Sequence, residues 1–281
     1  MKKHFLSRRY CYYIPLRFLV FFLGCSLFVL FTHQENYADS IDTSNGGHDY
    51  KIVWSVNKHQ GEQVYFSSYE KGRWTTPVQL SDSGDLAFHP TVSSGVDGRL
   101  WVVWTREDEK GSFLQFSTFN SSLWTKPRQI DTGMNNNKSA TIVVDRNNSA
   151  WIAWTSVTEI YSDIYWSRWD GVQWAKPIKA HADNKVPDLN PILSLDDSGQ
   201  IILSWQTFAN GKYMTVSQKF DKKQWKNTSN VYRESLATKQ KNLPHPPDFI
   251  KEFRKATISV KENGSSWSTP LSLLLDESLN Q

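Results

Sequence analysis

The chain has 281 residues and is rich in aromatic side chains, with 13 tryptophans but only two cysteines. Its formal net charge of +4 arises in the first 38 residues, which hold five bases and one acid and leave 27 of each for the rest. A neutral domain has no basic face for phosphate groups, so the sequence excludes nucleic acid as a partner.

The first 38 residues are organised like a targeting segment. Basic side chains precede an uncharged apolar run at residues 18–31, which is short for a membrane span but suits the core of a signal peptide. Residues 1–38 are therefore predicted to be a signal peptide or a signal anchor, with the rest of the chain exported. Cleavage after Ala38 would release the protein, whereas an uncleaved leader would hold it in the membrane through residues 18–31. Both cysteines, Cys11 and Cys25, lie in this leader, so the exported part folds without disulfides.

Tryptophan recurs through the rest of the chain at a nearly constant interval. One series consists of Trp54, Trp104, Trp154 and Trp205, and the other consists of Trp74, Trp124, Trp174 and Trp225. Both series step by 50, 50 and 51 residues. A period in this range indicates one supersecondary unit that is copied and stacked.

Each period is predicted to contain four strands. The first two form a hairpin, in which apolar or alternating runs flank a Gly, Asn or Asp turn; these hairpins cover residues 89–105, 139–155 and 190–206, with a weaker first copy at 40–56. A third strand, a tight turn, a Trp and usually a Pro follow, at residues 67–80, 117–130, 167–180, 217–231 and 259–275. Because Pro has no N–H to donate, the fourth strand is expected at an outer edge.

This pattern predicts an all-β fold in which residues 39–281 form one β-propeller of about five four-stranded blades, the last of them degenerate. Residues 229–255, where the inner strands of the fifth blade are expected, are Lys-rich and contain a Pro cluster. They are predicted to be an irregular insert with one short helix at 248–256. A four-bladed ring with residues 259–275 appended as a hairpin also fits, and the sequence does not choose between the two.

The turn segments carry a resemblance to a known family. Seven positions separate Ser67 from Trp74, Ser117 from Trp124 and Ser167 from Trp174. This spacing resembles the Asp-box (BNR) repeat of sialidase-like propellers, Ser-x-Asp-x-Gly-x-x-Trp, although Tyr69, Phe119 and Trp169 replace the Asp. The resemblance implies a propeller whose site lies on the face opposite the boxes. It would also imply three arginines that grip a sugar carboxylate, but the regular blades place only Arg106 on that face, so fold is implied more strongly than sialidase activity.

The site face is expected to consist of the turns between second and third strands and of the linkers between blades. Its carboxylates are Asp82, Asp85, Glu107, Asp108, Glu159, Asp183 and Asp188. Pairs of carboxylates are the groups that glycoside hydrolysis requires. The catalytic candidates are therefore Asp85, Glu107, Asp108 and Asp188, together with Arg106, and the alternative is that these are solvated loop carboxylates.

Aromatic side chains divide into two classes by their register. Tryptophans repeated at one strand position are predicted to pack between blades rather than to bind ligand. Aromatic residues outside the repeat are the ligand-binding candidates, namely Phe88, Tyr161 and Phe208. The histidines His48, His89 and His181 are scattered without ligand spacing, so neither a metal site nor a cofactor is predicted.

Three functions fit these observations. The favoured hypothesis is an exported, membrane-associated, non-catalytic propeller that binds a glycan, a cell-wall component or an envelope protein. The second is a divergent sialidase-like glycoside hydrolase that uses the carboxylates of the site face. The third is a structural scaffold of the cell envelope.

Overall fold

The computed structural model describes residues 49–58, 61–120, 122–158, 161–228, 255–261 and 271–274. These residues are all β, without a helix. A search of this part of the chain for a long apolar helix that could span a membrane finds none. Several predicted features lie outside the described residues: the leader 1–38 with its apolar run 18–31, residues 40–48 of the first hairpin copy, Glu159, Trp267 and residues 229–254 of the insert. The short helix predicted at 248–256 is wrong at its end, because Lys255 and Ala256 belong to a strand, and its other residues are outside the described ranges.

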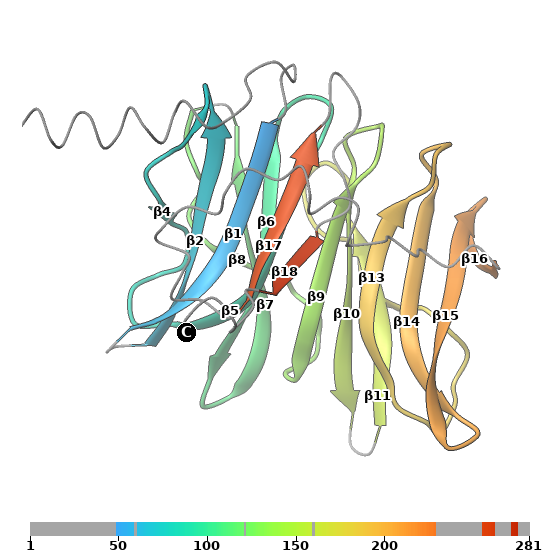
Figure 1. Ribbon diagram of the computed structural model, residues 1–281. Helices are drawn as coiled ribbons and strands as arrows, with labels where there is room; N and C mark the ends of the chain where they lie inside the picture. Colours follow the sequence, from blue (N-terminus) through green and yellow to red (C-terminus); the bar gives the residue numbers. More distant parts are fainter. Residues whose placement is uncertain are drawn as a thin grey trace, which may run out of the picture. The chain divides into compact units, whose positions relative to one another are not determined.

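The Trp-spaced repeat folds into four groups of antiparallel strands, which we call sheets 1 to 4 (Figure 1). One parallel bridge, between β2 and β5, joins sheets 1 and 2. Sheet 1 contains β1 (Asp49–Lys58), β2 (Gly61–Glu70), β3 (Arg73–Trp74) and β4 (Val78–Gln79). Sheet 2 contains β5 (Leu86–Ser94), β6 (Leu100–Asp108), β7 (Gly111–Phe119) and β8 (Arg128–Gln129). Sheet 3 contains β9 (Asn137–Val144), β10 (Ala150–Thr158), β11 (Tyr161–Arg168) and β12 (Ile178–Lys179). Sheet 4 contains β13 (Asp188–Leu195), β14 (Ile201–Ala209), β15 (Lys212–Asp221) and β16 (Gln224–Asn227).

The predicted strand order is confirmed. In sheets 2, 3 and 4 the strands pair in chain order, so the short fourth strand lies at an edge. In the first three sheets this strand begins directly after a proline, namely Pro77, Pro127 and Pro177. The missing N–H of each proline therefore falls where the ladder needs no donor.

The C-terminal hairpin lies beside the first sheet. It consists of β17 (Lys255–Lys261) and β18 (Leu271–Leu274), and β17 pairs antiparallel with β1, with Ile258 opposite Ile52. The predicted hairpin is thus present, but it does not begin a separate sheet. β17 is the neighbour of β1 in sheet 1, just as β5 is the neighbour of β6 in sheet 2. This is the arrangement expected of an appended hairpin, while the number of blades in a closed ring stays a prediction.

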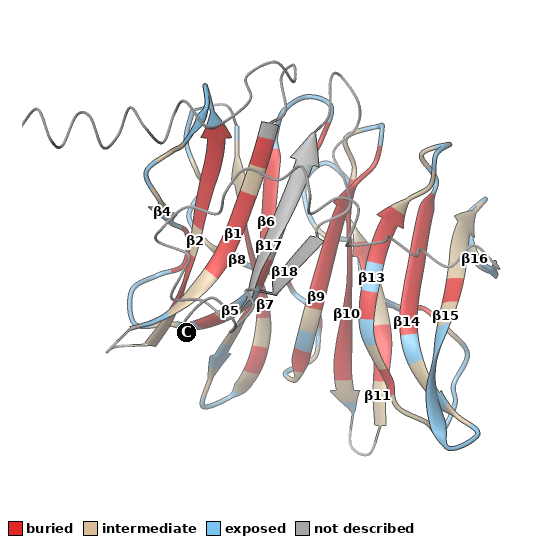
Figure 2. Cartoon of the chain, viewed as in Figure 1, coloured by how far each residue is buried: buried red, intermediate tan, exposed pale blue. Residues whose placement is uncertain are grey.

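The first tryptophan series is buried in the core. Trp104 and Trp154 are fully buried and Trp54 and Trp205 nearly so, as Figure 2 shows for the strands that carry them. Trp104, Trp154 and Trp205 lie on the second strands of sheets 2, 3 and 4, among apolar side chains that meet between neighbouring sheets, and Trp54 lies on β1. The prediction that these residues pack rather than bind is confirmed.

The second tryptophan series packs between sheets. Trp124 of the turn after β7 lies against Phe66 of sheet 1, with ring centroids 4.8 Å apart. Trp174, one sheet further on, contacts Phe116 of sheet 2 at 5.7 Å, and Trp225 contacts Trp166 of sheet 3 at 5.6 Å. Trp124, Trp174 and Trp225 therefore each reach back to the preceding sheet, which explains why this tryptophan recurs. Trp74 of sheet 1 packs instead against Tyr69 of its own sheet, with ring centroids 5.3 Å apart.

In sheets 1, 2 and 3 a serine closes the turn that leads to the tryptophan of the second series. The hydroxyls of Ser67, Ser117 and Ser167 donate to the carbonyl oxygens eight residues further on, at 2.7, 2.8 and 2.6 Å. All three serines are buried, so the bond satisfies a hydroxyl that water does not reach. The Ser-to-Trp spacing of the sequence thus has a structural role at the turn.

Close backbone approaches join the first three sheets. Glu62 of β2 forms a parallel bridge with Leu86, and Ser112 of β7 forms the same bridge with Asn136. The residue before each bridge is a glycine with positive φ, Gly61 at 135° and Gly111 at 133°. A Cβ at either position would overlap a carbonyl oxygen of the next linker, so only glycine allows this approach.

Aspartates close the turns between the first and second strands of sheets 3 and 4. In sheet 4, Asp196 accepts hydrogen bonds from the Ser198 hydroxyl at 2.6 Å and the Gln200 amide at 2.9 Å, and pairs with Lys219 at 3.0 Å. Although burial opposes ionisation, these bonds lower the pKa of Asp196 to about 2.

We expect Asp196→Asn to cost about 2 kcal/mol of unfolding free energy at pH 7. Because the folded-state pKa is depressed, this stability is present above the unfolded pKa of about 3.9 and is lost as the pH falls through about 2. Urea unfolding at pH 7, 4 and 2 measures the difference between variant and parent, with Asp197→Asn at the exposed neighbouring position as control. A difference that stays constant over this range would contradict the assignment.

Candidate functional site

One edge of the sheets collects the residues that the sequence selects for function. We call it the linker rim; it is formed by the turns β1–β2, β6–β7, β10–β11 and β14–β15 and by the linkers that precede β5, β9 and β13 (Figure 1). Backbone hydrogen bonds join turns to linkers: Glu62 N–H donates to Asp85 at 3.0 Å, and Phe208 N–H donates to Pro187 at 3.1 Å. The turns and linkers predicted to form the site face therefore lie along the same edge, and their role as a site stays a prediction.

Three of the catalytic candidates come together on this rim. Arg106, near the end of β6, donates through Nε to Asp85 at 3.1 Å and through Nη1 to Asp108 at 2.7 Å. The Lys110 amide also donates to Asp108, and this bond, together with Arg106, lowers the pKa of the Asp108 carboxyl. The guanidinium is thus neutralised by two carboxylates at a partly exposed position.

The other candidates are separate from this cluster. Glu107 points away to solvent, as expected for the residue between Arg106 and Asp108 on a strand. Phe88 is half-buried, and its ring lies edge-on to His89 at 5.0 Å. Tyr161 is the half-buried first residue of β11. The hydrogen bonds of the guanidinium to described side chains go to Asp85 and Asp108 and to none of these three.

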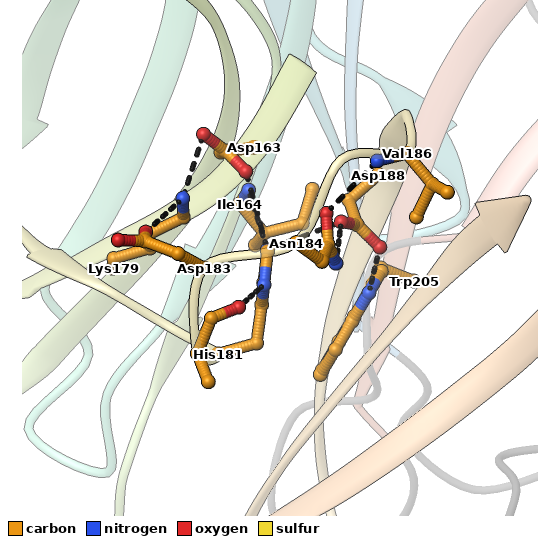
Figure 3. A network of polar contacts seen from close by, with 10 residues as sticks. Asp163, Ile164, Lys179, His181, Asp183, Asn184, Val186, Asp188 and Trp205 are labelled. Atoms are coloured by element: carbon orange, nitrogen blue, oxygen red, sulfur yellow. Dashed lines mark hydrogen bonds and ion pairs between the residues drawn. The ribbon is translucent and has the colours of Figure 1, made fainter. Parts of the chain in front are cut away.

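Asp188, the remaining catalytic candidate, belongs to a second cluster, between sheets 3 and 4 (Figure 3). It is the buried first residue of β13, and its Oδ1 accepts from Trp205 Nε1 at 2.8 Å. Its Oδ2 accepts from Asn184 at 2.8 Å and lies 3.4 Å from Nε2 of His181. The same Nε2 lies 3.8 Å from Oδ1 of Asp163, on β11.

The second cluster also includes a lysine and an aromatic ring. Lys179 pairs with the buried Asp163 at 2.8 Å and with the exposed Asp183 at 2.7 Å. Burial lowers the pKa of Lys179, but its bonds to Asp163 and Asp183 outweigh this and raise it, while the lysine lowers the pKa of Asp183. The imidazole of His181 stacks on Trp205, with ring centroids 5.6 Å apart. Asp163, His181 and Asp188 each offer one ligand atom, and these atoms lie within 4.8 Å of one another.

An exposed aromatic pair lies next to this cluster. Phe208 and Tyr213 are cross-strand partners at the β14–β15 turn, with ring centroids 5.2 Å apart. Phe208 follows Thr207, which stands directly opposite Asp188. The pair and the second cluster therefore share one stretch of the rim.

The sequence selected Phe208 and Asp188 but missed Asp163, His181 and Tyr213. His181 was set aside because no other ligand is near it in the sequence, yet the sheets bring Asp163 and Asp188 to it. A signal did exist in the repeat: the position of Gly61 and Gly111 is occupied by Tyr161 in sheet 3, and the following linker is one residue longer. In the described part of the chain no parallel bridge joins β11 to β13, and the cluster lies in its place.

Comparison with known proteins concerns the fold. No family model and no curated protein matches the sequence. Among solved structures, an ulvan lyase, which is a polysaccharide lyase, aligns with a TM-score of 0.51 at 11% identity, over 84% of this chain and 63% of that one. An endo-arabinase from Bacteroides thetaiotaomicron gives 0.45 at 15% identity, over 80% and 89% of the two chains. A protein of unknown function from Dyadobacter fermentans gives 0.49 at 10% identity, over 81% and 79%.

These identities are low, so the likeness supports the architecture and leaves activity open. The chain also spans less than two thirds of the ulvan lyase. The protein has an all-β fold, and its likeness to the ulvan lyase is a likeness of fold.

Proposed function

We propose that this protein is an exported, propeller-like protein that binds a polysaccharide through its linker rim and does not cleave it. One observation carries the proposal: Phe208 and Tyr213 are 37% and 50% exposed, and no other aromatic side chain in the described part of the chain is as open to solvent. Met214 beside them is 39% exposed. The other Phe, Trp and Tyr side chains of the described residues are buried or half-buried, so an exposed pair on the rim calls for a ligand.

The chemistry of the neighbourhood suits a sugar chain. Sugar rings present apolar C–H faces and hydroxyl-bearing edges, so they pair with aromatic rings flanked by polar groups. Phe208 and Tyr213 supply the aromatic rings. The linker before β13 supplies the polar groups, namely the exposed Asp183, Asn184 and Lys185. A polysaccharide could lie along this part of the rim with its rings on Phe208 and Tyr213.

The carboxylates favour binding over hydrolysis. Glycoside hydrolysis needs a protonated acid whose pKa is raised, beside a second carboxylate. The pKa of Asp108 is lowered by the Lys110 amide and by Arg106, which is opposite to the need of an acid catalyst. Asp188 is held by Trp205 and Asn184.

Export and ancestry form part of the proposal. The basic residues before the apolar run 18–31 support passage across a membrane, and the serine-closed turns support descent from an Asp-box propeller. The ulvan lyase of similar fold acts, by its name, on a polysaccharide, and we extend that substrate class to this chain as a ligand class.

A polysaccharide array probed with the purified full-length protein tests the proposal. Binding to at least one polysaccharide is expected, and Phe208→Ala and Tyr213→Ala should each weaken it about 10-fold or more, because each removes one stacking face. Leu123→Ala removes an exposed apolar side chain from the turn between β7 and β8, away from the aromatic pair, and it should leave binding unchanged.

Two results would overturn the proposal. Absence of binding to every polysaccharide would favour the envelope scaffold. Release of shorter saccharides from a bound polymer would favour the glycoside-active enzyme, and the carboxylates Asp85 and Asp108 would then be the first positions to replace.

A further inference from the structure

The linker between sheets 3 and 4 brings together three side chains that ligate metals. Asp163 comes from β11, His181 from the linker and Asp188 from β13 (Figure 3). We propose that they bind one divalent transition-metal ion, with Zn²⁺ as the representative, and that this ion ties sheet 3 to sheet 4. The proposal is independent of polysaccharide binding.

The hydrogen bonds of His181 define its tautomer. Nδ1 lies 2.9 Å from the carbonyl oxygen of Ala182, which can only accept, so Nδ1 carries the proton. Nε2 accepts a hydrogen bond from the Ile164 amide at 3.4 Å. Because an amide N–H can only donate, Nε2 carries a lone pair. In this tautomer the lone pair of Nε2 is directed into the cluster.

That lone pair faces two carboxylates with no proton between them. Asp188 Oδ2 is 3.4 Å and Asp163 Oδ1 is 3.8 Å from Nε2. Asp163 is buried, and its Oδ1 has no hydrogen-bond partner. A buried, unpartnered carboxylate oxygen beside a nitrogen lone pair is costly, and a cation at their centre would relieve it.

The distances suit a small metal ion. Bonds of about 2.0–2.1 Å in a tetrahedral arrangement separate ligand atoms by roughly 3.3–3.4 Å, so small side-chain shifts would complete the site. The contact from Ile164 to Nε2 is at the long limit of a hydrogen bond and would be replaced by the metal bond. One nitrogen and two oxygen ligands, without thiolate, suit Zn²⁺ and similar ions, whereas Ca²⁺ needs six to eight oxygens.

The surroundings hold each ligand in place. His181 donates its other ring nitrogen to a backbone carbonyl and stacks on Trp205, as metal-bound imidazoles require. Oδ1 of Asp188, which does not face His181, accepts from Trp205 Nε1. Oδ2 of Asp163, which likewise faces away from His181, pairs with Lys179. Each ligand is thus oriented before an ion arrives.

The other sheets provide an internal reference. In sheet 1 the Val64 amide donates to the Ser81 hydroxyl, just as the Ile164 amide of sheet 3 donates to His181. A serine is therefore enough to satisfy this strand amide, and the hydrogen bond does not explain why sheet 3 is followed by a histidine. At the position of Asp188, sheet 2 has Ala87 and sheet 3 has Asn137, whose amide donates to Ser112, Thr132 and Met134. Of the described linkers before β5, β9 and β13, the one before β13 carries the histidine, and it lies where the backbone bridge of the earlier sheets is missing.

Titration of the EDTA-treated, dialysed full-length protein with ZnCl₂ tests the site. We expect one equivalent to bind, and His181→Ala and Asp163→Asn to weaken binding by at least about 100-fold. Saturating Zn²⁺ should raise the melting temperature of the parent by about 5–10 °C, and CaCl₂ and MgCl₂ should not. His89→Ala, which removes an exposed histidine of β5, should bind Zn²⁺ as the parent does.

Asp163→Asn keeps the shape of the side chain, so it remains informative if His181→Ala does not fold. Circular dichroism of each variant without metal establishes that it is folded. An equal Zn²⁺ affinity in parent, Asp163→Asn and His181→Ala would place the metal elsewhere and overturn the proposal, as would absence of Zn²⁺ binding by the parent. Loss of polysaccharide binding with intact Zn²⁺ binding would bear only on the proposed function.

Discussion

Trp154→Ala should lower the free energy of unfolding by about 3–5 kcal/mol. Trp154 is fully buried, stacks on Tyr165 with ring centroids 6.2 Å apart, and packs among apolar side chains of sheets 2 and 3. Alanine would leave a cavity between two sheets, in addition to the lost burial of the indole. Equilibrium unfolding in urea at neutral pH measures the change.

Two phenylalanine variants provide the control. Nε1 of Trp154 is buried without a hydrogen-bond partner, so Trp154→Phe removes an unsatisfied donor and should cost much less than alanine. Nε1 of Trp104 donates to the buried Gln115 at 3.0 Å, so Trp104→Phe leaves that amide oxygen unpaired and should cost more than Trp154→Phe. Equal costs for the two would show that the indole N–H has no role in the core.

Gly111→Ala should destabilise the protein by about 2–4 kcal/mol. Gly111 has φ of 133°, and an added Cβ would overlap the carbonyl oxygen of Asn135. The same carbonyl accepts the Ser112 amide at 2.9 Å, so relief of the overlap would break the backbone bridge between sheets 2 and 3. Thermal and urea unfolding should both report the loss.

Gly72→Ala separates strain from overlap. Gly72 also has positive φ, at 78°, but nothing lies within 4 Å of an added Cβ. Its substitution should cost only the backbone strain, about 1 kcal/mol. If both variants lose the same stability, the approach of the two sheets does not depend on the absence of a side chain at Gly111.

Much of the fold could be predicted because its determinants are local and repeated. The hairpin turns, the proline before the fourth strand and the tryptophan interval each act within one repeat, and each occurs several times. The placement of β17 beside β1 could not be predicted, because it depends on a pairing between the two ends of the propeller segment. The strand pattern of residues 255–261 is compatible with any open edge.

The candidate site was less accessible to sequence reasoning. Asp85, Arg106 and Asp108 were found together because the turn and the linker that hold them face one another in every repeat. Asp163, His181 and Asp188 are brought together by one added linker residue and by a tyrosine in place of glycine. A repeat pattern reveals the residues that its copies share. A site formed by residues in which one copy differs from the others is found only when the copies are compared position by position.

The pairing of β17 with β1 also has a consequence for biosynthesis. β1 leaves the ribosome first among the described strands, but its partner β17 follows only after four sheets of chain have been made. Until then the backbone N–H and C=O groups on one side of β1 stay unpaired, so the first sheet to be translated is among the last to be completed. A release of the chain before Lys255 would leave an open edge that other chains could join, which makes premature termination an aggregation hazard rather than a mild truncation.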